Sequence, residues 1–146
     1  MLDDNGLKLL DHIGVALHRA AANWRATFRA EMAVRGYPWH LAASGEVLAH
    51  LGPSGIAQTE LTARMGLSKQ AVQQLLDQLE TDGVVRRESD PADKRAKRVM
   101  LTELGLADFA ERNRVKQQIE ERYRDKLGKK LFGKLEKALR KLAETD

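Results

Sequence analysis

Apolar residues recur at steps of three and four along most of the chain, which is the spacing of an amphipathic helix. The first such run predicts a helix from Leu7 to about Arg35, which Gly36-Tyr37-Pro38 would end. A helix of about 28 residues would measure about 42 Å. This is longer than a small domain can cover, so part of the apolar face is expected to pack against a second subunit.

The next apolar runs are shorter and lie between breaks in the pattern. One predicts a helix from Trp39 or His40 to Leu51, which Gly52-Pro53-Ser54-Gly55 would stop. Ile56 is expected to form a minimal strand. Two more helices are predicted at 58–65 and 68–82, with a tight Gly66-Leu67 turn between them. A short link with a glycine between two helices is typical of a helix-turn-helix.

The helix at 68–82 has well-marked ends and two different faces. Ser68 is a good N-cap, and Gly83 stands where a helix ends on a left-handed residue. Glutamine can pair with adenine in the major groove and lysine can bind guanine or phosphate, so the polar face suits base reading. Taken alone, the face also fits an ordinary solvated helix. The apolar face holds Val72, Leu75, Leu76 and Leu79, and the polar face holds Lys69, Gln70, Gln73, Gln74 and Asp77.

A charged hairpin is predicted directly after this helix. Val84 and Val85, and later Val99 and Leu101, are strand-forming residues on either side of a loop expected at 88–97. Six basic and three acidic residues lie between Val84 and Met100, so the hairpin supplies +3 of the formal charge of +4. Such a wing could lie on phosphates or enter the minor groove, although a solvated loop has the same composition.

Two helices are predicted after the hairpin. Thr102 is a plausible N-cap for a long helix that Gly128 would break, and Glu120 and Arg124 form a favourable i,i+4 pair in it. The last helix is basic on the outside. The apolar positions expected to be buried are Leu104, Ala107, Ala110, Val115, Ile119, Tyr123 and Leu127 in the first of the two, and Leu131, Leu135, Leu139 and Leu142 in the second.

The stretch from Asp90 to Gly105 resembles the wing signature of the MarR family of bacterial winged-helix transcription regulators. In that family an Asp-Lys/Arg-Arg tip is followed by a strand and by Leu-Thr-x-x-Gly, as in Asp93-Lys94-Arg95 and 101–105 of this chain. The resemblance extends back over 58–83, and the helix lengths agree over nearly the whole chain. Ala57 departs from it, because many relatives have Ser or Thr at this cap, and this weakens the cap only locally.

The resemblance implies a mainly α winged helix-turn-helix with a small β wing, in the order helix, helix, strand, helix, helix, strand, strand, helix, helix. Residues 1–35 and 103–146 would form the dimerisation region, and 36–102 would form the DNA-binding lobe. Two copies would bind a pseudo-palindromic operator on double-stranded DNA, commonly as a repressor. Arg95 would enter the minor groove and Asp93 would shape the tip. The expected DNA-binding residues are Ser68, Lys69, Gln70, Gln73, Gln74, Arg87, Asp93, Lys94, Arg95 and Lys97.

Composition narrows the function further. With 146 residues and 42% hydrophobic content, one compact domain can bury a core, and a charge of +4 is compatible with a polyanionic partner. The chain has no cysteine, which excludes disulfides and thiolate chemistry. The usual nucleophile, nucleotide and zinc motifs are missing, so neither an enzyme nor a cofactor is expected. Because there is no signal-peptide pattern and no apolar run of about 20 residues, we expect a cytoplasmic protein without a membrane partner.

Aromatic residues gather near the junction of the first two predicted helices. Core packing or dimer contact is the default interpretation of such a cluster. In the MarR family small aromatic effectors often bind near this junction, so the cluster could also line an effector pocket, with Arg35 or His40 holding a carboxylate or phenolate. The candidate pocket residues are Trp24, Phe28, Arg35, Tyr37, Trp39 and His40.

Two questions stay open at this level. No metal site is predicted, because scattered helical histidines such as His12, His18 and His50 are usually structural or exposed, but whether one of them binds a regulatory metal is not decided. The second interpretation of the whole chain is a winged-helix module that binds an acidic protein. Salt dependence and competition between duplexes separate it from a DNA-binding regulator.

Overall fold

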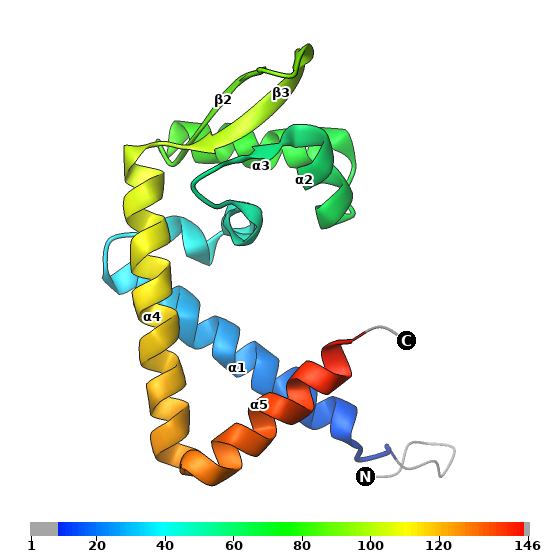
Figure 1. Cartoon of the computed structure of the whole chain (residues 1–146), viewed down its shortest axis with the longest axis vertical. Coiled ribbons are helices and arrows are strands. Elements are labelled where there is room, and N and C mark those ends of the chain that lie inside the picture. The colour runs from blue at the N-terminus through cyan, green and yellow to red at the C-terminus, as the bar shows by residue number, and fades with distance from the viewer. Residues whose placement is uncertain (1–8, 145–146) are drawn as a thin grey trace.

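The computed structural model describes residues 9–144, and the predicted helix start at Leu7 lies outside them. A long helix, α4, connects the winged lobe at the top of Figure 1 to α5 at the other end, and α1 runs beside part of it. The predicted order of elements is confirmed. In chain order the structure contains α1 (Ile13–Val34), η1 (Pro38–Leu41), η2 (Ala43–His50), β1 (Ile56–Ala57), α2 (Gln58–Met65), α3 (Lys69–Thr81), β2 (Val85–Asp90), β3 (Asp93–Leu101), α4 (Glu103–Leu127) and α5 (Lys129–Ala143).

The helix-turn-helix has the predicted local signals. Gly66 ends α2 in the left-handed conformation, with a φ of 64° that suits glycine. Ser68 caps α3 by accepting a hydrogen bond from the Ala71 N–H at 3.1 Å. Gly83 also has a positive φ, of 79°, just after α3. Ala57 gives α2 no side-chain cap, as its sequence predicted.

The sheet confirms the strand at Ile56 and corrects the length of the wing loop. Three antiparallel strands lie in the order β1-β3-β2, with Ile56 opposite Val99. The predicted loop at 88–97 is wrong, because β2 and β3 continue through the charged residues to a turn at Pro91-Ala92. Glu88 stands opposite Arg98 in the register, and a cross-strand pair of opposite charges stabilises the sheet. The strands therefore extend further into the charged segment than predicted.

The segment 38–50 forms two 3₁₀ helices in place of the single helix predicted from Trp39 or His40 to Leu51. Ala42, between them, has an extended backbone, with a φ of −98° and a ψ of 161°. A tight approach accompanies this break, since a Cβ at Gly45 would lie 2.7 Å from the Trp39 carbonyl oxygen. The two short segments pack on each other and on α1 and α3, so tertiary contact replaces the regular helix.

Two groups of buried apolar side chains hold the described residues together. The larger one fills the winged lobe, where Val72, Leu76 and Leu79 of α3 are fully buried as predicted. The smaller one joins α1 to α4 through Met32, Val115 and Ile119. Burying one large apolar side chain stabilises the folded state by about 1.5–3 kcal/mol, so these contacts are the main stabilising term.

The long helices differ from prediction in their ends and faces. α1 begins at Ile13, and residues 9–12 are not helical. His12 caps the helix, because its ring nitrogen accepts a hydrogen bond from the Gly14 N–H. In α4 the predicted stripe is right at Val115 and Ile119. It is wrong at Leu104, Ala107 and Ala110, which are exposed. Asp108 and Arg112 are buried on the inner face instead.

The last helix keeps its apolar row exposed in the protomer. Gly128 ends α4, and α5 begins at the next residue. Phe132 packs against Arg124, whose guanidinium carbon lies 4.7 Å from the centroid of the ring. No helix within residues 9–144 is long and apolar enough to cross a membrane. The exposed leucines of α5 are Leu131, Leu135, Leu139 and Leu142.

Candidate nucleic-acid interface

The outer face of α3 presents a row of polar side chains to solvent. Lys69, Gln70, Gln73 and Gln74 are all exposed, while the opposite face of the helix is anchored in the core. The Ser68 cap leaves the first turn of α3 well ordered at the point where these side chains begin. A rigid helix with short polar side chains near its N-terminus is the arrangement that base-edge contact in a major groove requires.

A hollow lies between α2, α3 and the wing, beside this polar face. Its volume is about 430 Å³. Three of the predicted DNA-binding residues on different elements, Lys69, Arg87 and Lys97, meet around it. The complete lining is Gln58, Lys69, Gln73, Glu80, Arg87 and Lys97.

Arg87 ties the wing to α3. From β2 its guanidinium forms ion pairs with Glu80 and Asp77, both on α3, and only 17% of its side chain is exposed. These carboxylates, Glu80 first, raise the pKa of Arg87 above its ordinary value. Two negative charges already balance this cation, so it is engaged inside the protein, in contrast to the other predicted DNA-binding cations.

The tip of the wing is shaped by two aspartates. Asp90 accepts a hydrogen bond from the Ala92 N–H at 2.9 Å, and Asp93 accepts one from the Arg95 N–H at 3.0 Å. Short aspartate side chains commonly stabilise turns in this way. The Asp93 carboxylate therefore contacts the backbone of the turn that it was predicted to shape.

Three cations at and near the tip stand free. Lys94, Arg95 and Lys97 are exposed and take part in none of the ion pairs formed within residues 9–144. By contrast, Arg86 pairs with Glu88, and Arg98 donates to the Ser54 carbonyl at 2.8 Å. Within the wing, the positive charge available to a polyanion is therefore concentrated at the tip.

A second cavity, of about 170 Å³, lies between α1, η2 and α4. Three of the six candidate pocket residues, Trp24, Phe28 and His40, line it. Trp24 and Phe28 stack with ring centroids 5.5 Å apart, and His40 meets the edge of Phe28 at 5.4 Å. The cavity also has four cations that were not predicted, namely Arg25, Arg29, Arg112 and Lys116, against one carboxylate, Glu46, which pairs with Arg29.

Lys116 is held in an unfavourable electrostatic environment. Its ammonium lies 5.6 Å from the centroid of the Phe28 ring. Partial burial, and then the nearby charge of Arg112, lower the pKa of Lys116 from its ordinary value. An anion in the cavity would relieve this repulsion.

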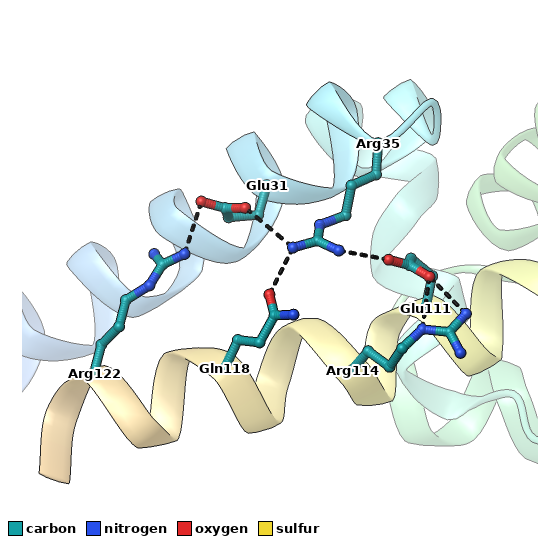
Figure 2. Close-up of polar contacts among 6 residues, drawn as sticks. All are labelled: Glu31, Arg35, Glu111, Arg114, Gln118 and Arg122. Carbon is teal, nitrogen blue, oxygen red and sulfur yellow. Dashed lines mark hydrogen bonds and ion pairs between the residues drawn. The ribbon is translucent and has the colours of Figure 1, made fainter.

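The remaining three predicted pocket residues lie elsewhere. Tyr37 and Trp39 pack edge to face, with Trp39 in the core of the lobe. Figure 2 shows Arg35 between α1 and α4, where its guanidinium reaches Glu111 at 2.7 Å and Gln118 at 2.6 Å. Arg35 therefore links the two helices on a flank away from the cavity lining.

A buried charged network joins the cavity to the lobe. Asp108 is 0% exposed and accepts from Trp39 Nε1 at 3.1 Å and His40 Nε2 at 2.7 Å. Arg112 Nε lies 2.9 Å from the other Asp108 oxygen. Arg112 also donates to the carbonyls of Leu48 and Leu51, at 2.5 and 3.3 Å. This pair on α4 therefore holds both ends of the segment 39–51.

Comparison with known proteins adds to this geometry. Residues 43–96 match the sequence model of the MarR family. The reduced form of MarR from E. coli shares 22% identity with the chain, with 94% of this chain and 100% of that chain covered and a TM-score of 0.77. The segment 43–96, which holds most of the winged helix-turn-helix, is therefore similar in sequence to the MarR family, and the chain shares the fold of the solved MarR structures. A mutant E. coli MarR in complex with operator DNA has a similar fold, with 24% identity, 90% of this chain and 94% of that chain covered, and a TM-score of 0.71. A transcriptional regulator from Thermotoga maritima is also similar, with 23% identity, 89% of this chain and 90% of that chain covered, and a TM-score of 0.63.

Arg25 and Arg29 of the cavity were missed from sequence, and so were Asp108, Arg112, Lys116 and Gln58. Asp108 and Arg112 stand four apart, which is also the spacing of any surface ion pair on a helix, so nothing local marked them as buried. Lys116 follows them one turn later on the same face. Gln58 is the first residue of α2, and only the tertiary fold brings it under the polar face of α3.

Proposed function

We propose that the chain is a homodimeric, sequence-specific DNA-binding regulator of transcription that represses from a pseudo-palindromic operator. The observation that carries this proposal is the exposed polar face of α3 beside a wing tip whose three cations form no ion pair with any residue from 9 to 144. Helix side chains would read base edges, and Lys94, Arg95 and Lys97 would contact phosphates or the minor groove. The lobe 36–102 would bind DNA, and the terminal helices would join two copies.

The exposed apolar rows of α1 and α5 support the dimer. Leu139 is 44% exposed and Leu142 67%, and Ile13 on α1 is also largely exposed. A row of exposed leucines along one helix is apolar surface that a partner would cover, because large exposed apolar patches on soluble proteins commonly mark interaction sites. A second copy related by a twofold axis would cover it with the same surface and place two α3 helices about 34 Å apart, one turn of DNA.

Loss of wing-tip charge tests the DNA-binding proposal. We expect Arg95→Ala to lower operator affinity and to reduce the slope of log affinity against log salt by about one for each phosphate that the side chain neutralises. Lys126→Ala, which removes an exposed charge near the far end of α4, is the matched control and should leave both values unchanged. Equal binding of operator and scrambled duplex by the wild type would instead favour the module that binds an acidic protein.

We propose that the second cavity regulates DNA binding by taking a small aromatic acid. The stacked Trp24 and Phe28 rings offer an apolar wall, and the cationic lining attracts a carboxylate. A ligand that binds better to the DNA-free geometry lowers operator affinity, and couplings of about 1–3 kcal/mol, or about 5- to 150-fold, are typical. Salicylate should then quench tryptophan fluorescence and release operator DNA over the same concentration range.

Lys116→Met separates regulation from DNA reading. It removes a cavity cation that lies on α4, away from α3 and the wing. We expect weaker salicylate binding with unchanged operator affinity in the absence of salicylate. If salicylate binds the wild type without changing operator affinity, the cavity has no regulatory role.

A further inference from the structure

Gln58 has a buried side-chain carbonyl without a hydrogen-bond partner. Only 9% of this residue is exposed, and its Oε1 atom is fully covered and accepts no hydrogen bond within the described part of the chain. Buried polar atoms in native proteins almost always have a partner, so the Gln58 carbonyl calls for an explanation, and a partner gained when a ligand binds is one. Gln58 lines the same hollow as Lys69 and Gln73 of the polar face of α3, at the proposed DNA surface.

Few donors on the lining of the hollow are free of other partners. Of its six lining residues, Arg87 is committed to Glu80 and Asp77. The ammonium groups of Lys69 and Lys97 are strong phosphate ligands and are unpaired within residues 9–144. The Gln73 amide is the remaining neutral donor, one turn after Lys69 on the same face of α3.

The chemistry of an amide gives this neighbour a specific use. A glutamine that reads adenine accepts from the adenine N6 amino group and donates one N–H to N7. Its second N–H points back toward the protein and needs an acceptor. An acceptor at that place also fixes which way round the amide stands, because the reversed amide would set two carbonyl oxygens against each other.

We propose, on the basis of the DNA-binding function above, that Gln58 is a positioning residue for base reading. In the DNA complex its Oε1 accepts the second N–H of Gln73, which holds the Gln73 amide in the orientation that selects adenine. Gln58 itself touches no base. Its effect is a preference for adenine at one base pair in each half-site.

Selection of bound sequences from a random duplex library tests this assignment. The Gln58→Met variant keeps the length of the side chain but has no acceptor, so adenine preference at one position per half-site should fall about fivefold or more, with the other positions unchanged. Gln58→Glu keeps an acceptor oxygen and should retain the preference. Gln117→Met, at an exposed position on α4, is the matched control.

The results can separate the role proposed for Gln58 from the DNA-binding function on which it rests. A purely structural role for Gln58 would weaken binding to all sequences alike, and the Gln58→Met motif would then equal that of the wild type. The same result would overturn the proposal, as would a motif change that persists in a Gln73→Ala background, because Gln58 acts through Gln73. A wild-type protein that selects no motif would refute the DNA-binding function itself.

Discussion

Replacement of Asp108 by leucine should destabilise the protein strongly although it adds an apolar side chain to a buried site. Asp108 is fully buried and accepts from Trp39 and His40 while it pairs with Arg112. Leucine removes the negative charge and leaves the Arg112 guanidinium, which is only 4% exposed, without its counter-charge. The perturbation therefore creates an uncompensated buried cation.

The structure sets the expected size of the effect. Removal of one partner of a buried ion pair costs about 3–5 kcal/mol. Burial already lowers the pKa of Arg112, with Asp108 acting in the opposite direction, so the pair depends on that carboxylate. Against a total stability of about 5–15 kcal/mol, this loss is large. Arg112→Met should lower the free energy of unfolding by a comparable amount, because methionine cannot donate hydrogen bonds to the carbonyls of Leu48 and Leu51.

Urea unfolding at pH 7 and fixed protein concentration, followed by tryptophan fluorescence, measures these differences. The double variant Asp108→Leu with Arg112→Met removes both charges, so its loss should be smaller than the sum of the single losses by about 1–3 kcal/mol. Asp125→Leu, at an exposed position on the same helix, should stay within about 0.5 kcal/mol of the wild type. A loss below about 1 kcal/mol for Asp108→Leu, or strict additivity in the double variant, would refute the reasoning.

Three further outcomes are expected. Arg87→Gln should lower operator affinity with an unchanged salt slope, because Asp77 and Glu80 already balance its charge; a slope reduced as in Arg95→Ala would show a phosphate contact instead. Hydrogen bonds from Arg114 and Arg35 lower the pKa of Glu111 from 4.5, so its stabilisation holds above that pH and is lost as the pH falls through the lowered pKa. Glu111→Gln should therefore lose less stability than the wild type in acid urea titrations, and an identical pH profile would contradict this. Leu139→Asp should convert the proposed dimer to a monomer in sedimentation, and a stable dimer of this variant would contradict an interface at Leu139.

Helix ends were predictable because their signals are local. Ser68 and Thr102 cap helices through hydroxyls that reach backbone N–H groups three residues ahead, and Gly66 tolerates a left-handed backbone. Such contacts depend on neighbours in sequence and need no knowledge of the fold. The apolar face of α3 was predictable for a related reason, since a helical period assigns one side to the core.

Other features depended on partners far away in sequence. The wing loop was predicted too long, because charged residues at 88–97 are typical of a loop until the opposite strand pairs them. The helix at 39–51 became two 3₁₀ segments through the approach of Gly45 to the Trp39 backbone. Arg35 was expected in the aromatic pocket, yet Glu111 and Gln118 of α4, more than 70 positions later, hold it elsewhere.

The sequence by itself determined the order of the elements, the polar face of α3 and the charge of the wing, because each follows from the spacing of residues within one element. Only the tertiary structure decided which charges stay free. Within residues 9–144 it pairs Arg87 with α3, buries Asp108 with Arg112, and leaves Lys94 and Arg95 unpaired at the tip. The physical reason is that the energy of a charge depends on its burial and on its partners within a few ångströms, and folding brings those partners from distant parts of the chain.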